Sequence, residues 1–327
     1  MLFFRTRWMV TVAVMILIKQ IESMCFLQYY LPFHPFLLVC IVCLLFLKLK
    51  ESKTKRECVL IEDFFFWNSY EFYQCRSKFS DLRNRFCVNY CRIPSSPTTA
   101  SLPIMFDLRT EQKLTLVKDE KSCHSSWAFA TVASIESMQS NRTIFFNTTR
   151  KDLSSQQLID CVGWQGCTGG VDVIKALNYA RIIGLVEADL YPYRERRGFC
   201  KNIFFLLFPH QRIRAFCLIC STDVDSLKRA LFLYRTPLIT VLKIRNSTAF
   251  NAISKDIVME DIGTTITSQR VVNLVGWGRG YSSKTNQTVD YWIVRNSQGE
   301  KWGHNGYAYI IQQGNLFNIL DQNYLIN

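Results

Sequence analysis

Thirteen cysteines constrain this 327-residue chain more than any other feature of its sequence. They show no zinc-type spacing with histidine, and the single Cys-x-x-Cys, Cys217 with Cys220, is a weak signal by itself. A cysteine set of this kind favours a disulfide framework, which forms in an oxidising compartment. Four Asn-x-Thr sequons point to the same compartment as candidate glycosylation sites: Asn141, Asn147, Asn246 and Asn286. The sequence therefore predicts a secreted, disulfide-bonded glycoprotein without a metal or cofactor. A membrane-anchored or lysosomal protein is the runner-up.

Residues 1–50 are expected to form a targeting segment. Arg5 and Arg7 precede a short apolar run, as in a signal peptide. Residues 23–47 contain no Lys, Arg, Asp or Glu and are long enough to span a bilayer. The basic residues that follow them would then hold the rest of the chain in the cytoplasm, which conflicts with the cysteines and sequons. Anchoring by residues 23–47 is therefore not favoured, and a mis-joined gene model is the alternative explanation of the conflict.

The net charge of +13 is spread along the chain. A basic surface favours acidic partners, anionic membranes or glycans. No nucleic-acid-binding motif accompanies the charge, so we expect no nucleic-acid partner and prefer a soluble basic domain. The apolar content of 49% excludes general disorder.

The compact part of the chain is predicted to begin near residue 101, after a Pro- and Ser-rich linker at residues 94–99. Residues 125–140 carry Phe129, Val132, Ile135 and Met138 at three-residue spacing, which predicts a helix. Further helices are expected at residues 154–160 and 171–181. Strands are expected at residues 270–277, 291–295 and 306–311, which are rich in Val, Ile, Tyr and Trp. Helices followed by strands suggest an α+β fold of two lobes with a cleft between them.

Five blocks of residues resemble the papain-like cysteine proteases, in that family's order. The first, Ser122-Cys123-His124-Ser125-Ser126-Trp127, resembles the segment that carries the family's nucleophile. The other blocks lie at residues 153–161, 166–170, 272–278, and 291–297 with 302–307. The resemblance covers about residues 101–327. It implies a papain-like fold, in which a helical lobe and an antiparallel β-barrel-like lobe flank an interlobe cleft.

Finer details resemble the group 1 mite allergens and their inactivated paralogues in parasitic mites. The segment Phe106-Asp107-Leu108-Arg109 is similar to the mature N-terminus of that branch, and residues 79–86 to the end of its propeptide. Residues 51–100 are therefore expected to be a degenerate propeptide remnant and linker. The resemblance also implies three disulfides: Cys123 with Cys167, Cys161 with Cys200, and Cys91 with Cys217, the last being an extra bridge of the mite branch.

The residues at the family's catalytic positions depart from its pattern. By the resemblance, the nucleophile position holds Ser126, the base position Arg270 and the oxyanion position Glu120. Only the orienting asparagine, Asn296, matches, and the tryptophan that shields it in the family is Gln298. Guanidinium has no lone pair with which to accept a proton, and a serine hydroxyl needs a general base. The loss of a triad member typically lowers kcat by about 10⁴–10⁶. We therefore predict a proteolytically inactive chain. His124, two residues before Ser126, is expected to be an exposed turn residue rather than a substitute base.

Three functions remain open. The first is a secreted pseudoprotease that binds peptides, host proteins or protease inhibitors in a cleft walled by Gly169 and Gly170. The second is residual hydrolysis through Ser126. The third is a structural or antigenic protein without a ligand.

The two charged substitutions also predict a contact. Glu120 and Arg270 replace groups that flank the nucleophile from opposite lobes, so we expect an ion pair across the centre. Ser126 would lie beneath that pair, and Asn296 would accept a hydrogen bond from the guanidinium. Two unrelated substitutions are the alternative.

Overall fold

The computed structural model describes residues 90–91, 93, 101–146, 151–162, 166–170, 172–201, 210–219 and 223–327. The expected targeting segment, almost all of the expected propeptide remnant, Asn147 and the side chain of Asn141 lie outside the described residues. Predictions for those parts stay predictions.

The three helices expected from the sequence are present, with shifted ends. They are α4 (Ser126–Phe146), α5 (Ser155–Cys161) and α6 (Val173–Ile182). Helix α5 begins one residue later than expected because Ser154 is its N-cap: the Ser154 hydroxyl accepts a hydrogen bond from the Gln157 amide at 3.0 Å. Helix α4 continues six residues past its expected end at Ser140.

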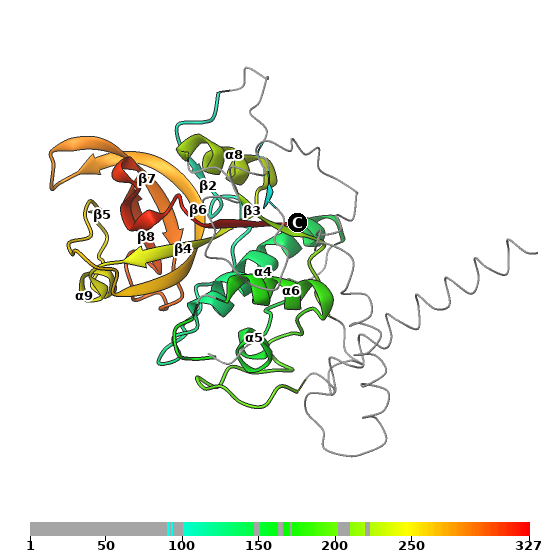
Figure 1. Cartoon of the computed structure of the whole chain (residues 1–327). Coiled ribbons are helices and arrows are strands. Elements are labelled where there is room, and N and C mark those ends of the chain that lie inside the picture. Colours follow the sequence, from blue (N-terminus) through cyan, green and yellow to red (C-terminus); the bar gives the residue numbers. More distant parts are fainter. Residues whose placement is uncertain are drawn as a thin grey trace, which may run out of the picture. The chain divides into compact units, whose positions relative to one another are not determined.

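Within the described ranges, one sheet of nine strands forms the rest of the fold. Its order is β1-β3-β9-β4-β6-β7-β8-β5, with β2 paired to β6. All pairings are antiparallel except β1 with β3 and β5 with β8. The strands are β1 (Tyr90–Cys91), β2 (Phe106–Asp107), β3 (Phe216–Ile219), β4 (Leu238–Ile244), β5 (Ile257–Val258), β6 (Ser268–Ser282), β7 (Gln287–Arg295), β8 (Tyr307–Ile311) and β9 (Asn323–Ile326). The α+β class is confirmed, and the described strands form an open, strongly curved sheet rather than a closed barrel (Figure 1).

Short helices interrupt the strands, which the sequence reasoning did not anticipate. They are α8 (Val224–Tyr234), α9 (Ser247–Asn251) and a 3₁₀ segment (Gln313–Asn318). Helix α8 is amphipathic, since Leu227, Ala230 and Leu231 are buried on one face. Asp223 caps its start by accepting a hydrogen bond from the Ser226 amide at 2.7 Å.

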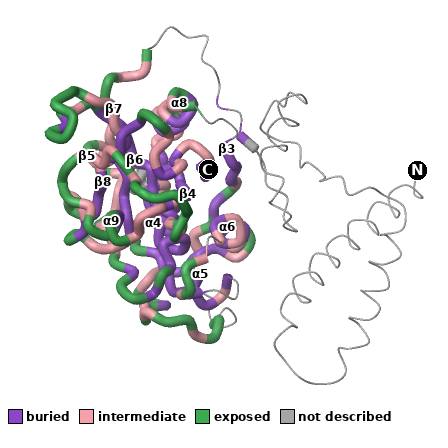
Figure 2. Tube along the Cα trace, turned by 60° about the vertical axis from the view of Figure 1, so that its left-hand side comes forward, coloured by how far each residue is buried: buried purple, intermediate pink, exposed green. Residues whose placement is uncertain are grey.

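Two hydrophobic cores fill the described domain, which gives the two lobes their physical basis. One core lies among α4, α5 and α6 and includes Trp127. The other lies under the sheet and includes Trp277 and Trp292. Helix α4, buried along most of its first four turns, packs between them (Figure 2). The Asn273 side chain on β6 donates to the Ala130 carbonyl on α4 at 2.9 Å, so the two lobes are joined by polar as well as apolar contacts.

Three disulfides connect cysteines that the structure describes. Cys123–Cys167, Cys161–Cys200 and Cys91–Cys217 are bonded, with Cα–Cα distances of 4.5, 4.7 and 5.3 Å. These are the three pairs that the family resemblance implied. Within the described ranges, no helix has the length and apolarity needed to cross a membrane.

Candidate functional site

The site expected from the sequence forms where the first turn of α4 meets β6. Ser126 is the first residue of α4 and is 7% exposed. Its hydroxyl oxygen accepts a hydrogen bond from the Val271 amide on β6 at 3.1 Å. Arg270 precedes Val271 in the strand, so this bond brings the expected nucleophile and base positions together.

Glu120 and Arg270 form the ion pair that the sequence predicted. The Arg270 Nη1 donates to Glu120 Oε1, and the Ser125 amide donates to Glu120 Oε2 at 2.7 Å. Glu120 is 1% exposed, and this burial raises the pKa of its carboxyl although the Arg270 charge and the two donors lower it. Ser125 immediately precedes α4, so its bond to Glu120 places the ion pair at the start of that helix. The pair therefore closes over the N-terminus of the helix.

Asn296 does not make the contact that we expected. Its amide nitrogen donates to Gln298 Oε1 at 2.7 Å, while its carbonyl oxygen is buried without a hydrogen-bond partner among the described residues. The prediction that this oxygen accepts from the Arg270 guanidinium is therefore wrong. The physical reason is that Glu120 offers a charged acceptor, and a carboxylate holds a guanidinium more strongly than a neutral amide does.

Gln298 and Asn251 extend a polar chain from Asn296. Gln298 Nε2 donates to Asn251 Oδ1 at 3.1 Å, which connects the end of β7 to α9. The same helix supplies Phe250, whose ring lies 6.0 Å from the Arg270 guanidinium carbon. Sequence reasoning missed Asn251 and Phe250, because α9 lies in a stretch with no resemblance block and only its Asn246 N-cap signals a helix.

No histidine side chain among the described residues forms a hydrogen bond with Ser126. His124 is exposed and bridges to Thr168 by backbone pairing, as expected for a turn residue. His304 Nδ1 lies 3.1 Å from the Tyr309 hydroxyl, on β8. His210 directly precedes Gln211, which forms a backbone bridge with Leu185. A general base for Ser126 is therefore not provided by any of these three side chains.

Gly169 and Gly170, which we call the glycine edge, lie beside the start of α4. Cys123–Cys167 and the His124–Thr168 bridge hold residues 166–170 against the turn that precedes Ser126. Gly169 has a φ of +86°, which only glycine adopts readily, and a side chain there would lie 3.8 Å from the Cβ of His124. Gly169 is exposed and Gly170 is half-buried, so this segment lies at the surface.

A small pocket lies behind the centre, between α4 and the ends of β6 and β7. Its volume is about 10 Å³, which is room for one water molecule. Ser297 belongs to its lining, and the Ser297 hydroxyl is buried without a hydrogen-bond partner in the described part of the chain. The lining residues are Lys118, Phe129, Ala130, Ala133, Val271, Asn273, Arg295, Asn296 and Ser297.

Glu136 is a buried charge that sequence reasoning missed. It lies on α4 and is 0% exposed. Lys118 Nζ donates to it at 2.5 Å, the Leu153 amide at 2.7 Å and the Thr115 hydroxyl at 2.8 Å. A charge with three donors is structural, and it fixes the segment that leads into Glu120.

The remaining predicted positions are surface features. Asn246 is the N-cap of α9, where its side chain accepts from the Ala249 amide at 2.9 Å. Asn286 lies exposed between β6 and β7 with a φ of +54°. Sugar attachment at either asparagine stays a prediction. No cluster of His, Cys, Asp or Glu suited to a metal ion occurs among the residues that the structure describes.

Known proteins match this chain over the same part. The family model described as papain family cysteine protease matches residues 102–326. Peptidase 1 of the mite Euroglyphus maynei is 29% identical over 259 residues, which is 78% of this chain and 75% of that protein. Peptidase 1 of Dermatophagoides farinae is 32% identical over 249 residues, 75% of this chain and 71% of that protein. A solved structure from work on antibody cross-reactivity between the mite allergens Blo t 1 and Der p 1 has a TM-score of 0.60 at 26% identity. That match covers 73% of this chain and 75% of the solved one.

Proposed function

The chain belongs to the papain family of cysteine proteases, and we propose that it is a secreted member that binds peptides or proteins without cleaving them. The single observation that carries the proposal is the Glu120–Arg270 ion pair over Ser126. Host proteins and protease inhibitors are the partner classes that we propose for such a binding protein.

The chemistry of the centre supports inactivity. A hydroxyl attacks a peptide carbonyl only when a base at hydrogen-bond distance takes its proton. Arg270 is a cation without a lone pair, and its guanidinium is engaged by Glu120. The Glu120 carboxylate, when ionised, repels the oxyanion that forms during peptide cleavage. Both partners of the pair therefore oppose the reaction that Ser126 would have to perform.

The glycine edge supports binding. An extended peptide pairs with an exposed backbone segment, and main-chain hydrogen bonds then supply affinity without any catalytic group. Gly169 and Gly170 are held by Cys123–Cys167, so the edge is preorganised. Preorganisation lowers the entropy that is lost on binding.

Hydrolysis of a broad peptide library by the full chain tests the inactivity. We expect no turnover above background for the natural chain or for Ser126→Ala. Ser126→Cys alone is expected to remain inactive, because Arg270 and Glu120 still oppose the step. The triple variant Ser126→Cys, Arg270→His, Glu120→Gln restores the family residues and serves as the positive arm. Turnover by the natural chain that Ser126→Ala abolishes would mean that the chain is a hydrolase.

Affinity selection from the same library tests the binding. Peptides retained by the natural chain should be lost on Gly169→Val, because a β-branched side chain at a φ of +86° distorts the edge. Thermal unfolding of both proteins checks that the variant is folded. Equal retention by the two proteins, or no retained peptide at all, would leave the chain without the proposed ligand class.

A further inference from the structure

The hairpin of β6 and β7 ends in a sequon that lies beside an exposed aromatic ring. Residues 283–286 form the turn, and Asn286 is its last residue. Thr288, the third residue of the sequon, lies directly opposite Tyr281 in the antiparallel register. Figure 1 shows this hairpin in orange, with its end on the side of the domain away from α5 and α6. The sequon and the ring therefore lie together at the surface.

Three side chains share one face of the hairpin end. Directly opposed residues of an antiparallel pair project to the same side, as Tyr281 and Thr288 do. The Tyr281 hydroxyl donates to the carbonyl oxygen of the Asn286 side chain, which brings the asparagine to the same face. Arg279 and Asp290, two residues farther along each strand, also lie on this face and form an exposed ion pair at 2.7 Å.

The Tyr281 ring is open to solvent. Tyr281 is 63% exposed, and Asn286 and Thr288 are exposed as well. Within the described residues, the Tyr281 ring stacks on no other ring and on no cation. An exposed tyrosine needs no explanation by itself. This one, however, is hydrogen-bonded to the acceptor residue of a sequon, so it lies next to any group that the asparagine carries.

The turn and the hydrogen bond together orient the Asn286 side chain. Asn286 has a φ of +54°, in the left-handed region that asparagine adopts more readily than most residues with a side chain. Its Oδ1 is engaged by Tyr281. Its Nδ2, the atom to which a sugar is attached, makes no hydrogen bond to a described residue. A sugar on Nδ2 therefore leaves the bond from Tyr281 in place.

We infer that Asn286 carries an N-linked glycan and that the Tyr281 ring is the platform on which its first N-acetylglucosamine packs. The inference rests on the secretory part of the proposed function, because the glycan is transferred in the secretory pathway. In that transfer the bond between C1 of the sugar and a lipid-linked diphosphate breaks, and a bond from C1 to Asn286 Nδ2 forms. The lipid diphosphate leaves, and Nδ2 loses one proton.

The packing has a physical basis in the charge distribution of the ring. The face of an aromatic ring is negative, and the C–H bonds on one face of a sugar ring are weakly positive. The contact also removes apolar area of the exposed ring from water. The first sugar therefore stabilises the hairpin end, whereas the sugars beyond it extend past the ring and add nothing to the stability.

Site occupancy is measured first, by peptide mass spectrometry of the full chain secreted from eukaryotic cells. We expect a glycan at Asn286. A glycan at Asn246 and none at Asn286 would overturn this inference alone. A chain without sugar at any of its sequons would overturn the secretory part of the proposed function together with the inference.

Thermal unfolding then tests the packing. Changing Thr143, Thr149 and Thr248 to Ala leaves Asn286 as the acceptor of the one remaining sequon. Three forms of this protein are compared: one with the complete glycan, one trimmed by an endoglycosidase to a single N-acetylglucosamine, and one made without glycan in cells treated with an inhibitor of lipid-linked oligosaccharide synthesis. We expect the first two forms to unfold at the same midpoint, and the third about 2 °C lower.

Two variants of Tyr281 assign the effect. Tyr281→Phe keeps the ring and should keep the difference between the glycosylated and unglycosylated forms. Tyr281→Leu keeps an apolar side chain without the ring, so its three forms should unfold at one midpoint. Three results would overturn the role of Tyr281: equal midpoints for all forms of the Tyr281 protein, a difference that survives Tyr281→Leu, or a loss of stability on trimming to one sugar.

Discussion

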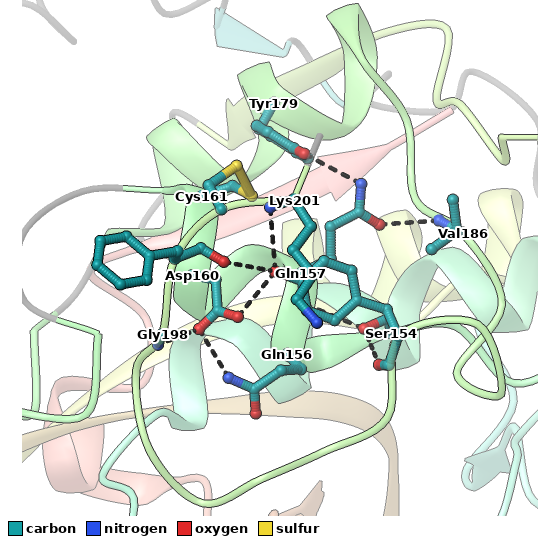
Figure 3. Close-up of a disulfide and its surroundings, with 12 residues drawn as sticks. Ser154, Gln156, Gln157, Asp160, Cys161, Tyr179, Val186, Gly198 and Lys201 are labelled. Atoms are coloured by element: carbon teal, nitrogen blue, oxygen red, sulfur yellow. Dashed lines mark hydrogen bonds between the residues drawn. A yellow bond between two sulfur atoms is a disulfide. The ribbon is translucent and has the colours of Figure 1, made fainter. Parts of the chain in front are cut away.

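Two buried carboxylates, Asp160 in α5 (Figure 3) and Glu120 in the segment before α4, are held by different sets of hydrogen-bond donors. The Asp160 side chain accepts from four donors, including an arginine that is 34% exposed. Glu120 accepts from one amide and one arginine, and its pKa is raised because burial outweighs those contacts. Around Asp160 the polar groups are paired. Around Glu120, the Asn296 carbonyl and the Ser297 hydroxyl are buried without partners in the described structure.

This difference distinguishes the structural hydrogen-bond network around Asp160 from the candidate site around Ser126. Unpaired buried polar groups are rare in structural networks, because each lowers stability by about 1–3 kcal/mol. Among the described residues, none of the partners of Asp160 is such a group, whereas the region around Ser126 has three, because the indole nitrogen of Trp127 is also buried without a partner. Unpaired buried polar groups are expected at a site whose surroundings fit a reaction that its present residues do not perform. The observation is consistent with the proposed function.

Asp160→Ala is expected to give the largest effect in the molecule. It leaves buried donors on Tyr191, Gln156 and Gly198 and an unpaired charge on Arg194, so the free energy of unfolding should fall by about 3–5 kcal/mol. Denaturant titration of the two proteins measures the change. Asp290→Ala, at an exposed pair with Arg279, is the control and should change stability far less. Similar losses at both positions would remove the distinction between the scaffold and the surface.

Glu120 and Arg270 should be coupled in a double-mutant cycle. Glu120→Gln, Arg270→Ala and the double variant are compared by denaturant titration at pH 8. The coupling free energy should be about 1–3 kcal/mol, since the pair is nearly buried and charge-assisted. Glu111 and Arg235, which pair outside the centre, supply the matched cycle. Simple additivity at Glu120 and Arg270 would mean that the two substitutions are energetically unlinked.

Two buried asparagines differ in the same way, and substitutions there are expected to change stability by smaller amounts. Asn273 donates to Ala130 at 2.9 Å and to Ser134 at 2.8 Å, whereas Asn296 makes one bond, to Gln298, and has an unpaired oxygen. Asn273→Leu should lower the free energy of unfolding by about 1–3 kcal/mol. Asn296→Leu should lower it by less than about 1 kcal/mol, because it also removes an unsatisfied acceptor. The reverse order in thermal and denaturant unfolding would show that the Asn296 oxygen has a partner in solution.

The pH dependence of stability provides the smallest expected effect. The pKa of Glu120 is raised above its ordinary value of 4.5 in the folded chain. The folded state therefore holds a proton more tightly than the unfolded state, and this contribution to stability is complete below pH 4.5 and is lost as the pH rises through the folded pKa. Glu120→Gln should remove that slope from a plot of unfolding free energy against pH. An unchanged slope would assign it to another group.

Sequence reasoning reached the architecture by two routes. Periodicity located α4, because apolar spacing records which face is buried, and a high content of Val, Ile, Tyr and Trp located the strands around Trp277 and Trp292. The resemblance supplied the two-lobed fold, the mite branch and the disulfide pairs, and the family and the mite relatives are confirmed. Helix α8 was missed although Leu227, Ala230 and Leu231 have helical spacing, since strand-rich neighbours dominated the interpretation of the C-terminal third.

The sequence identified the residues of the site but not all of the contacts that they make. Ser126, Glu120 and Arg270 lie together because the resemblance fixed their positions in the fold. The Glu120–Arg270 ion pair was predicted, but the further contact from Arg270 to Asn296 was not formed, because the direction in which the Asn296 side chain points cannot be read from the sequence. Phe250, Asn251 and Glu136 lie outside the expected site residues, because a contact between segments far apart in the chain leaves no local pattern.

The Cys91–Cys217 disulfide has a consequence for maturation. It joins residues 126 positions apart, and β1 pairs with β3 at the same place. The expected mature N-terminus lies near Phe106, downstream of Cys91. A protease that cut the linker at residues 94–99 would therefore release nothing. The upstream piece would stay covalently attached as the light chain of a two-chain protein, separable only by reduction.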